Sequence, residues 1–169
     1  IENYEKAIKI DPNYAQAYNN LGIALQKLKK ISLAINNYKK AIGLKNDFPE
    51  ALNNLGNATW ELNKSKDSLV YLEKAIKINP NYAEAFNGLA SIHYDLGDNQ
   101  AAISNYQESI KINPNYAEAY YNLGMLFHDI ARFDESLSSY NKAIELNPND
   151  EKFYNNLGNL LNNLGKYEE

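Results

Sequence analysis

Apolar residues recur along the whole chain with the spacing of an amphipathic helix, in runs that end at short polar turns. One stretch, residues 83–112, contains two such runs. Their apolar positions mostly lie three or four residues apart, on one face of a helix: Phe86, Leu89, Ile92 and Leu96 in the first run, and Ala102, Ile103, Tyr106, Ile110 and Ile112 in the second. Gly97 and Asp98 separate the runs, and Asn113-Pro114 ends the second, because proline cannot continue a helix. The pattern predicts two helices joined by a tight turn.

The same pair of helices returns every 34 residues. With Ala15 as position 1, four blocks align without a gap: 15–48, 49–82, 83–116 and 117–150. Residues 1–14 match the end of a preceding block, and residues 151–169 match the start of a following one. We therefore predict four complete helical hairpins, with the second helix of a truncated repeat before them and the first helix of another after them. All of these form one solenoid domain.

Small residues occupy three fixed positions of the repeat. They are Gly22, Gly56, Ala90, Gly124 and Gly158 at position 8, Ala34, Ser68, Ala102 and Ser136 at position 20, and Ala7, Ala41, Ala75, Ser109 and Ala143 at position 27. A larger side chain at these positions would hold the helix axes apart, so the pattern predicts closely packed helices. Asn46 replaces the proline found at position 32 of the other blocks, and we expect an irregular junction there. Because a single hairpin cannot bury both of its faces, we predict an all-α solenoid of stacked antiparallel hairpins.

The repeat resembles the tetratricopeptide repeat (TPR) signature. The matching residues are Tyr18, Leu21, Gly22, Leu25, Ala34, Tyr38 and Ala41, with their equivalents one period on. The resemblance covers essentially the whole chain. It implies a right-handed superhelix in which the first helix of each repeat lines a concave face, a surface that usually binds peptides or other proteins. We therefore expect a protein-protein interaction module that binds an extended peptide or a partner protein in this groove.

Asparagine is unusually frequent, with 27 residues, and many of them fall on the first helices. Position 6 carries Asn20, Asn54, Asn122 and Asn156, with Gly88 in the remaining block, and position 9 carries Asn57 and Asn159. A carboxamide can hydrogen-bond the backbone of an extended peptide whatever the peptide's side chains are. Position 6 is similar to the asparagine ladder in the TPR superhelix of O-linked N-acetylglucosamine transferases, which implies a peptide-binding role for these residues and a missing rung at Gly88. The alternative is compositional, because asparagine is also common on the second helices, as at Asn36 and Asn105.

Aromatic and acidic residues also recur on the first helices. Trp60, Tyr94 and His128 share position 12, where they form either a strip in the groove or packing between neighbouring first helices. We count Trp60 and Tyr94 among the candidate peptide-binding residues. Acidic side chains at position 13, such as Glu61, approach the same side. The groove is therefore expected to fit a neutral or basic peptide better than an acidic one.

Composition narrows the classes of function. The net charge of −4 and the pI near 5.3 argue against nucleic-acid binding, and no run approaches the roughly 18 apolar residues of a membrane span. With no cysteine and two histidines, the sequence predicts no metal site. It also lacks a nucleophile placed beside a base and a glycine-rich phosphate loop, so we expect no enzyme activity and no cofactor. The compartment is left open, with the cytoplasm as the default expectation.

The two ends of the chain lead to further expectations. The chain begins at Ile1 without a methionine, so we expect a longer parent protein. This segment would then be either the substrate-recognition region of a larger enzyme, such as a glycosyltransferase, or an assembly scaffold that uses its ends and convex face. Leu157 and Leu161 lack a following helix to cover them, and Tyr4 and Ile8 lack a preceding one. Because these faces are complementary, we expect head-to-tail self-association.

Overall fold

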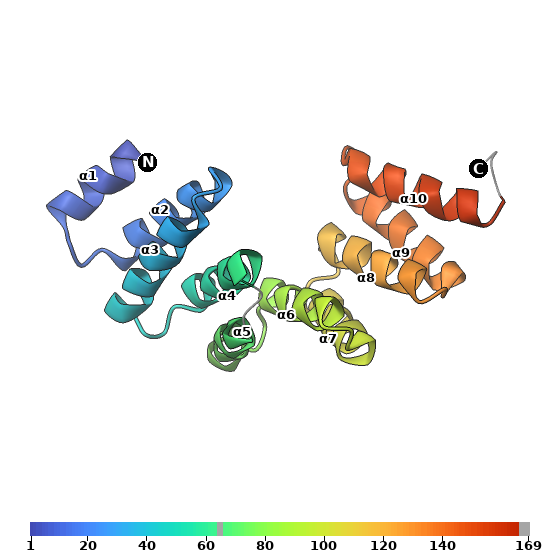
Figure 1. The fold of residues 1–169 in the computed structure, drawn as a ribbon, viewed down its shortest axis with the longest axis horizontal. Helices are drawn as coiled ribbons and strands as arrows, with labels where there is room; N and C mark the ends of the chain where they lie inside the picture. Colours follow the sequence, from blue (N-terminus) through green and yellow to red (C-terminus); the bar gives the residue numbers. More distant parts are fainter. Residues whose placement is uncertain (64–65, 166–169) are drawn as a thin grey trace. The chain divides into compact units, whose positions relative to one another are not determined.

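The computed structural model describes residues 1–63 and 66–165, which form ten α-helices and no β-strand (Figure 1). The helices are α1 (Glu2–Ile10), α2 (Ala15–Lys27), α3 (Ile31–Leu44), α4 (Pro49–Asn63), α5 (Asp67–Ile78), α6 (Ala83–Asp95), α7 (Asn99–Ile112), α8 (Ala117–Asp129), α9 (Phe133–Leu146) and α10 (Glu151–Asn163). This is the all-α helical-repeat solenoid that the sequence predicts. The first helices of the repeats are α2, α4, α6, α8 and α10, and the others are second helices.

Linkers of equal length join each second helix to the next first helix. Every second helix ends at position 30 and the next helix begins at position 1, so the linker always spans positions 31–34. At three linkers the side chain at position 31 accepts a hydrogen bond from the backbone N–H two residues on, as in the bond of 2.9 Å from Asn13 N to Asp11 Oδ1. Lys45 cannot form this turn, but its linker has the same length. The irregularity expected there lies in the turn and not in the length of the linker, because residues 46–47 form a bend where the corresponding residues of the other linkers form a turn.

At the turns that follow α2, α6, α8 and α10, the residue at position 15 has a left-handed backbone conformation. Gly97 and Gly165 adopt it at φ of +80° and +70°. Lys29 and Ala131 occupy the same position at φ of 60° and 59°, although side chains disfavour this region. The repeat geometry is thus strong enough to hold two non-glycine residues in a strained conformation.

The chain divides into two compact units, Ile1–Gly88 and Leu89–Glu169, which we call unit 1 and unit 2. In unit 1, α2 packs against α3 and α4 against α5, and Leu21, Leu25, Tyr38 and Leu55 form one core cluster (Figure 1). In unit 2, α8 packs against α7 and α9, and α9 against α10. The main cluster of unit 2 includes Ala90, Ala102, Tyr106, Leu123 and Phe127. Each unit therefore has its own apolar core between consecutive helices.

In two repeats the glycine at position 8 lies against the aromatic ring at position 24. A Cβ atom added at Gly22 would lie 2.5 Å from Tyr38 Cε1, and one added at Gly124 would lie 2.8 Å from ring carbons of Tyr140. Both rings are almost completely buried. A larger side chain at position 8 would therefore force a packed ring to move.

Candidate functional site

Neighbouring first helices are joined by hydrogen bonds between side chains that lie 35 residues apart, which is one repeat plus one residue. Asn54 Nδ2 donates to Asn19 Oδ1 at 3.0 Å in unit 1, and Asn156 Nδ2 donates to the Tyr121 hydroxyl at 2.7 Å in unit 2. Each bond joins position 5 of one first helix to position 6 of the next. We call these two pairs the 5/6 ladder.

A second set of bonds links positions 12 and 13 with the same spacing, and we call it the 12/13 ladder. Gln26 Nε2 donates to Glu61 Oε2 at 3.0 Å, the Tyr94 hydroxyl donates to Asp129, and Asn163 Nδ2 lies 2.9 Å from His128 Nε2. The bond from Gln26, followed by the bond and charge of Lys29, lowers the pKa of Glu61. Burial, followed by the bond to Asp129, raises the pKa of Tyr94. The 12/13 ladder therefore fixes polar side chains that sequence reasoning had assigned only to a groove wall.

The predicted position-6 and position-9 asparagines have different surroundings. Asn20 is half-buried and accepts a bond of 3.1 Å from Gln16, whereas Asn54 and Asn156 belong to the 5/6 ladder. Asn122 is half-buried, and Asn159 is exposed. A Cβ added at Gly88 would lie 2.7 Å from Asn57 Oδ1, so the carboxamide of Asn57 fills the space left by the missing rung.

The two aromatic candidates differ in accessibility. Trp60 is only 8% exposed, so little of its ring is available to a ligand. Tyr94 is half-buried, and its hydroxyl is held by Asp129. The packing alternative considered for position 12 thus describes the surroundings of Trp60 better than the groove strip.

Sequence reasoning missed the structural part played by position 5. Asn19, Asn53 and Asn87 have exposed fractions of 2%, 6% and 9%, which is unusual for a polar side chain in a helix. The signal was present, because position 5 carries asparagine in four of the five first helices. What the sequence could not give was the one-residue offset that pairs position 5 with position 6 of the next repeat.

Each unit has a cavity on the face formed by its first helices. In unit 1 a cavity of about 410 Å³ is lined by Asn54, Ile23, Tyr38, Gln26, Glu61, Lys27 and Lys29. In unit 2 a cavity of about 500 Å³ is lined by Asn156, Tyr121, Asn155, Glu151 and Lys152. Each cavity is lined by one position-6 asparagine, which donates one N–H to its partner in the 5/6 ladder. Within the described residues, its carbonyl oxygen and second N–H are left for another partner.

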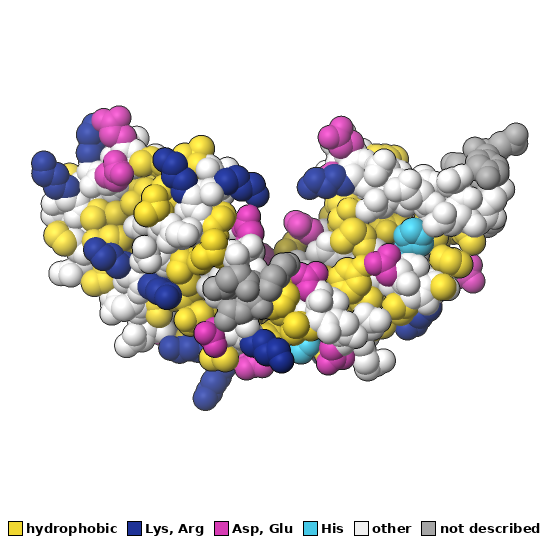
Figure 2. All heavy atoms as spheres, in the orientation of Figure 1, with side chains coloured by type: hydrophobic (Ala, Val, Ile, Leu, Met, Phe, Trp, Pro, Cys, Tyr) yellow, Lys and Arg dark blue, Asp and Glu magenta, His cyan; other side chains and the backbone are white. Residues whose placement is uncertain are grey.

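The two units carry opposite charge. Residues 1–88 contain twelve lysines and nine Asp or Glu residues, a formal net charge of +3, whereas residues 89–169 contain five Lys or Arg and twelve Asp or Glu residues, a formal net charge of −7. On the face drawn in Figure 2, more basic side chains lie over unit 1 than over unit 2. A further unit 2 cavity, of about 250 Å³, is lined by Glu118, Asp150 and Lys152 among others. Burial, followed by the charges of Asp150 and Glu118, raises the pKa of Tyr121, which lines these two unit 2 cavities.

Among the described residues no helix is both long and apolar enough to cross a bilayer. The same residues contain no group of three His, Cys, Asp or Glu side chains that could hold a metal ion.

Stacked helical hairpins with polar ladders between their first helices define a helical-repeat scaffold for protein-protein interaction. Family profiles identify the repeat: one described as a TPR repeat matches residues 1–29, 27–63 and 90–130, and others described as tetratricopeptide repeats match 49–82, 71–104, 117–150 and 139–169. The chain belongs to the tetratricopeptide repeat family. Its partner is accordingly a protein or a peptide. No curated protein matches the sequence significantly.

Solved structures with the same fold include those of three proteins, two of which are described as TPR proteins. The MamA protein is 27% identical, with a TM-score of 0.70 over 91% of this chain and 84% of MamA. TTC0263, a thermophilic TPR protein of Thermus thermophilus, is 22% identical, with a TM-score of 0.82 over 94% of this chain and 87% of that one. YrrB, described as a TPR protein with an unusual peptide-binding site, is 24% identical, with a TM-score of 0.67 over 98% and 85% of the two chains. The last two likenesses concern the fold alone.

Proposed function

We propose that the chain binds an extended segment of a partner protein on the face formed by its first helices, and that it acts as a binding module without catalysis. The main support for this proposal is that, in each unit, the carboxamide of a position-6 asparagine lines a cavity. Asn54 and Asn156 each line a cavity, each is oriented by a ladder bond, and each retains an acceptor and a donor. An extended backbone offers the complementary N–H and C=O groups.

The 5/6 ladder supports this function by fixing the carboxamides before the ligand arrives. An asparagine held by one hydrogen bond has fewer rotamers to lose on binding, so less of the interaction energy is offset by lost conformational entropy. The asparagines therefore serve both the fold and the partner. Asn20, Asn122, Asn57 and Asn159 extend the same face as weaker contacts in this proposal, and Tyr94 contributes the edge of its ring.

The charges around each cavity set a preference for the ligand. Glu118, Asp150 and Glu151 outnumber Lys152 around the unit 2 cavities, which favours a neutral or basic segment there. The unit 1 cavity contains Lys27 and Lys29 against Glu61, and Glu61 is already bound to Lys29. The preference for a neutral or basic ligand thus applies to unit 2, whereas a neutral ligand suits unit 1.

A peptide array tests the proposal with two double variants. Asn54→Ala with Asn156→Ala removes both cavity carboxamides, and Asn36→Ala with Asn149→Ala removes two exposed asparagines elsewhere. Both proteins are probed below their melting temperatures. We expect the first variant to lose signal across peptides of different sequence, because backbone bonds do not depend on side chains, and the second to match the wild type. Equal binding by all three proteins would refute the proposal.

Two alternatives and one additional expectation predict different results. If the chain is the substrate-recognition region of a larger enzyme such as a glycosyltransferase, the full reading frame encodes a catalytic domain. If it is an assembly scaffold that uses its ends and convex face, substitutions in the two cavities leave partner capture unchanged. Head-to-tail self-association stays a prediction. A sedimentation coefficient that rises with protein concentration would support it, and a constant monomer value would count against it.

A further inference from the structure

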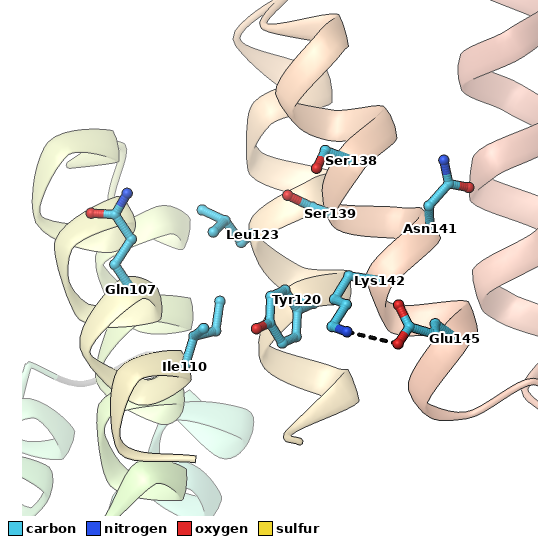
Figure 3. Close-up of a pocket in the computed structure, with 9 residues that line it drawn as sticks. All are labelled: Gln107, Ile110, Tyr120, Leu123, Ser138, Ser139, Asn141, Lys142 and Glu145. Atoms are coloured by element: carbon cyan, nitrogen blue, oxygen red, sulfur yellow. Dashed lines mark hydrogen bonds and ion pairs between the residues drawn. The ribbon is translucent and has the colours of Figure 1, made fainter. Parts of the chain in front are cut away.

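Unit 2 contains another cavity, which shares no residue with the cavities on the first-helix face. It has a volume of about 640 Å³ and lies between α7 and α9, with α8 as its floor (Figure 3). The apolar part of its lining is Ile110, Tyr120 and Leu123. Gln107 of α7 lies across from Ser139 and Lys142 of α9. The cavity therefore has an apolar floor and polar walls.

One of the four complete repeats, the second, has an aromatic residue facing the equivalent space, whereas the first and third repeats carry Asn37 and Asn105 at that position. In the second repeat, position 23 is Tyr71, which packs against the core clusters of Leu52 and Leu55, as Ile42 does. These three residues occupy the repeat positions of Tyr120, Leu123 and Ile110, the apolar residues of the unit 2 cavity. A tyrosine ring from the second helix thus packs against the clusters that contain two of the equivalent apolar residues in unit 1.

The fourth repeat has Ser139 at position 23 instead. Its Oγ donates a hydrogen bond of 2.7 Å to Glu135 O, one turn earlier in α9. The side chain is short and turned back onto its own helix, so it does not extend over Leu123. Tyr120 is larger than its counterpart Leu52 and takes up part of the space, but the cavity remains. Compared with the second repeat, the apolar residues of this cavity therefore lack an aromatic side chain from the second helix.

We infer that this cavity accepts an aromatic side chain, tyrosine in particular, from a partner protein. Lys142 and Glu145 are the charged residues of the lining, and they pair with each other at 2.8 Å, so the site favours an uncharged group. The aromatic ring of Tyr120 offers an offset or edge contact to an incoming ring. The carboxamides of Gln107 and Asn141 on the walls can hydrogen-bond a phenol hydroxyl.

The experiment uses p-cresol, the side-chain analogue of tyrosine, titrated into the whole chain with methyl-labelled Ile and Leu. We expect saturable shifts of the Ile110 and Leu123 methyl signals in the wild type. We also expect nuclear Overhauser contacts from these methyls to the cresol ring. Ser139→Tyr places a ring where Tyr71 lies in the second repeat, and it should weaken binding at least about tenfold. Ser32→Tyr, at an exposed serine of α3, is the matched control and should bind like the wild type.

Several outcomes would overturn the inference. They are the absence of saturable shifts in the wild type, shifts without contacts to Ile110 or Leu123, and equal affinity in Ser139→Tyr and the wild type. If Ser139→Tyr does not fold, the wild-type contacts decide alone, together with a titration of tert-butanol. Because tert-butanol has the hydroxyl but no ring, binding of it as tight as that of p-cresol would contradict a site for aromatic groups.

Discussion

Replacing Asn54 by alanine separates the structural role of the position-6 asparagines from their proposed role in binding. If these residues served only a ligand, alanine at any of them would stabilise the free protein, because asparagine is a poor helix former. The 5/6 ladder predicts otherwise for Asn54. Its Nδ2 satisfies Asn19 Oδ1, and Asn19 is only 2% exposed. Asn20 is the matched control, because within the described residues its side chain accepts a bond from the exposed Gln16 alone.

The magnitudes follow from these contacts. Leaving the buried carbonyl oxygen of Asn19 without a partner lowers the free energy of unfolding by about 1 to 3 kcal/mol. The higher helix propensity of alanine raises it by about 0.5 to 0.7 kcal/mol. Asn54→Ala should therefore lower the free energy of unfolding by about 0.3 to 2.5 kcal/mol. Asn20→Ala loses a surface contact worth about 0.2 to 0.5 kcal/mol against the same propensity gain, so its stability should stay level or rise slightly.

The assay is urea unfolding followed by far-ultraviolet circular dichroism, with native-state hydrogen exchange of α2 and α4 amides to locate the effect. The double variant of Asn19 and Asn54 completes a cycle. It should lose less than the sum of the single variants, by at least about 0.5 kcal/mol. If Asn54→Ala is as stable as Asn20→Ala, or if the cycle shows no coupling, then the ladder bond does not contribute to the fold and the reasoning fails.

Three further predictions concern strained, unpaired or buried groups. Thr59 Oγ1 is buried and has no partner among the described residues. Thr59→Val should therefore raise the free energy of unfolding, measured by urea titration, by about 1 kcal/mol. A lower free energy of unfolding would show that the hydroxyl is hydrogen-bonded. Ala131→Gly should relieve the left-handed strain at φ of 59° and raise the melting temperature, with a gain of about 0.5 to 1 kcal/mol, whereas Gly97→Ala should lower it. Burial raises the pKa of three position-24 tyrosines from 10.0 to about 12: Tyr38, Tyr106 and Tyr140. The folded state therefore binds these protons more tightly than the unfolded state. The contribution of the three tyrosines to the free energy of unfolding is fully present below pH 10 and is lost as the pH rises towards 12. Urea unfolding midpoints, measured alongside tyrosinate absorbance, should show that decline.

The comparison of sequence and structure is clearest in the turns and the asparagines. Position 15 was readable as a turn because Gly97 stands there, and the chain turns in the same conformation at Lys29 and Ala131. Position 6 was readable as a recurring asparagine, but its hydrogen-bond partner at position 5 was not. That partner lies on another helix, and the offset of 35 residues depends on how far one first helix is shifted along the next.

Periodicity and residue size in the sequence determined the repeat, the helical hairpins and the close contacts at position 8, because helical spacing and steric exclusion act within a single repeat. Only the tertiary structure decided that Trp60 is buried, that Asn57 fills the space beside Gly88, and that Ser139 leaves a cavity. These features depend on which side chains of neighbouring helices meet. A pattern along one helix gives the direction of a side chain, but the stagger and separation of the helices determine what that side chain contacts.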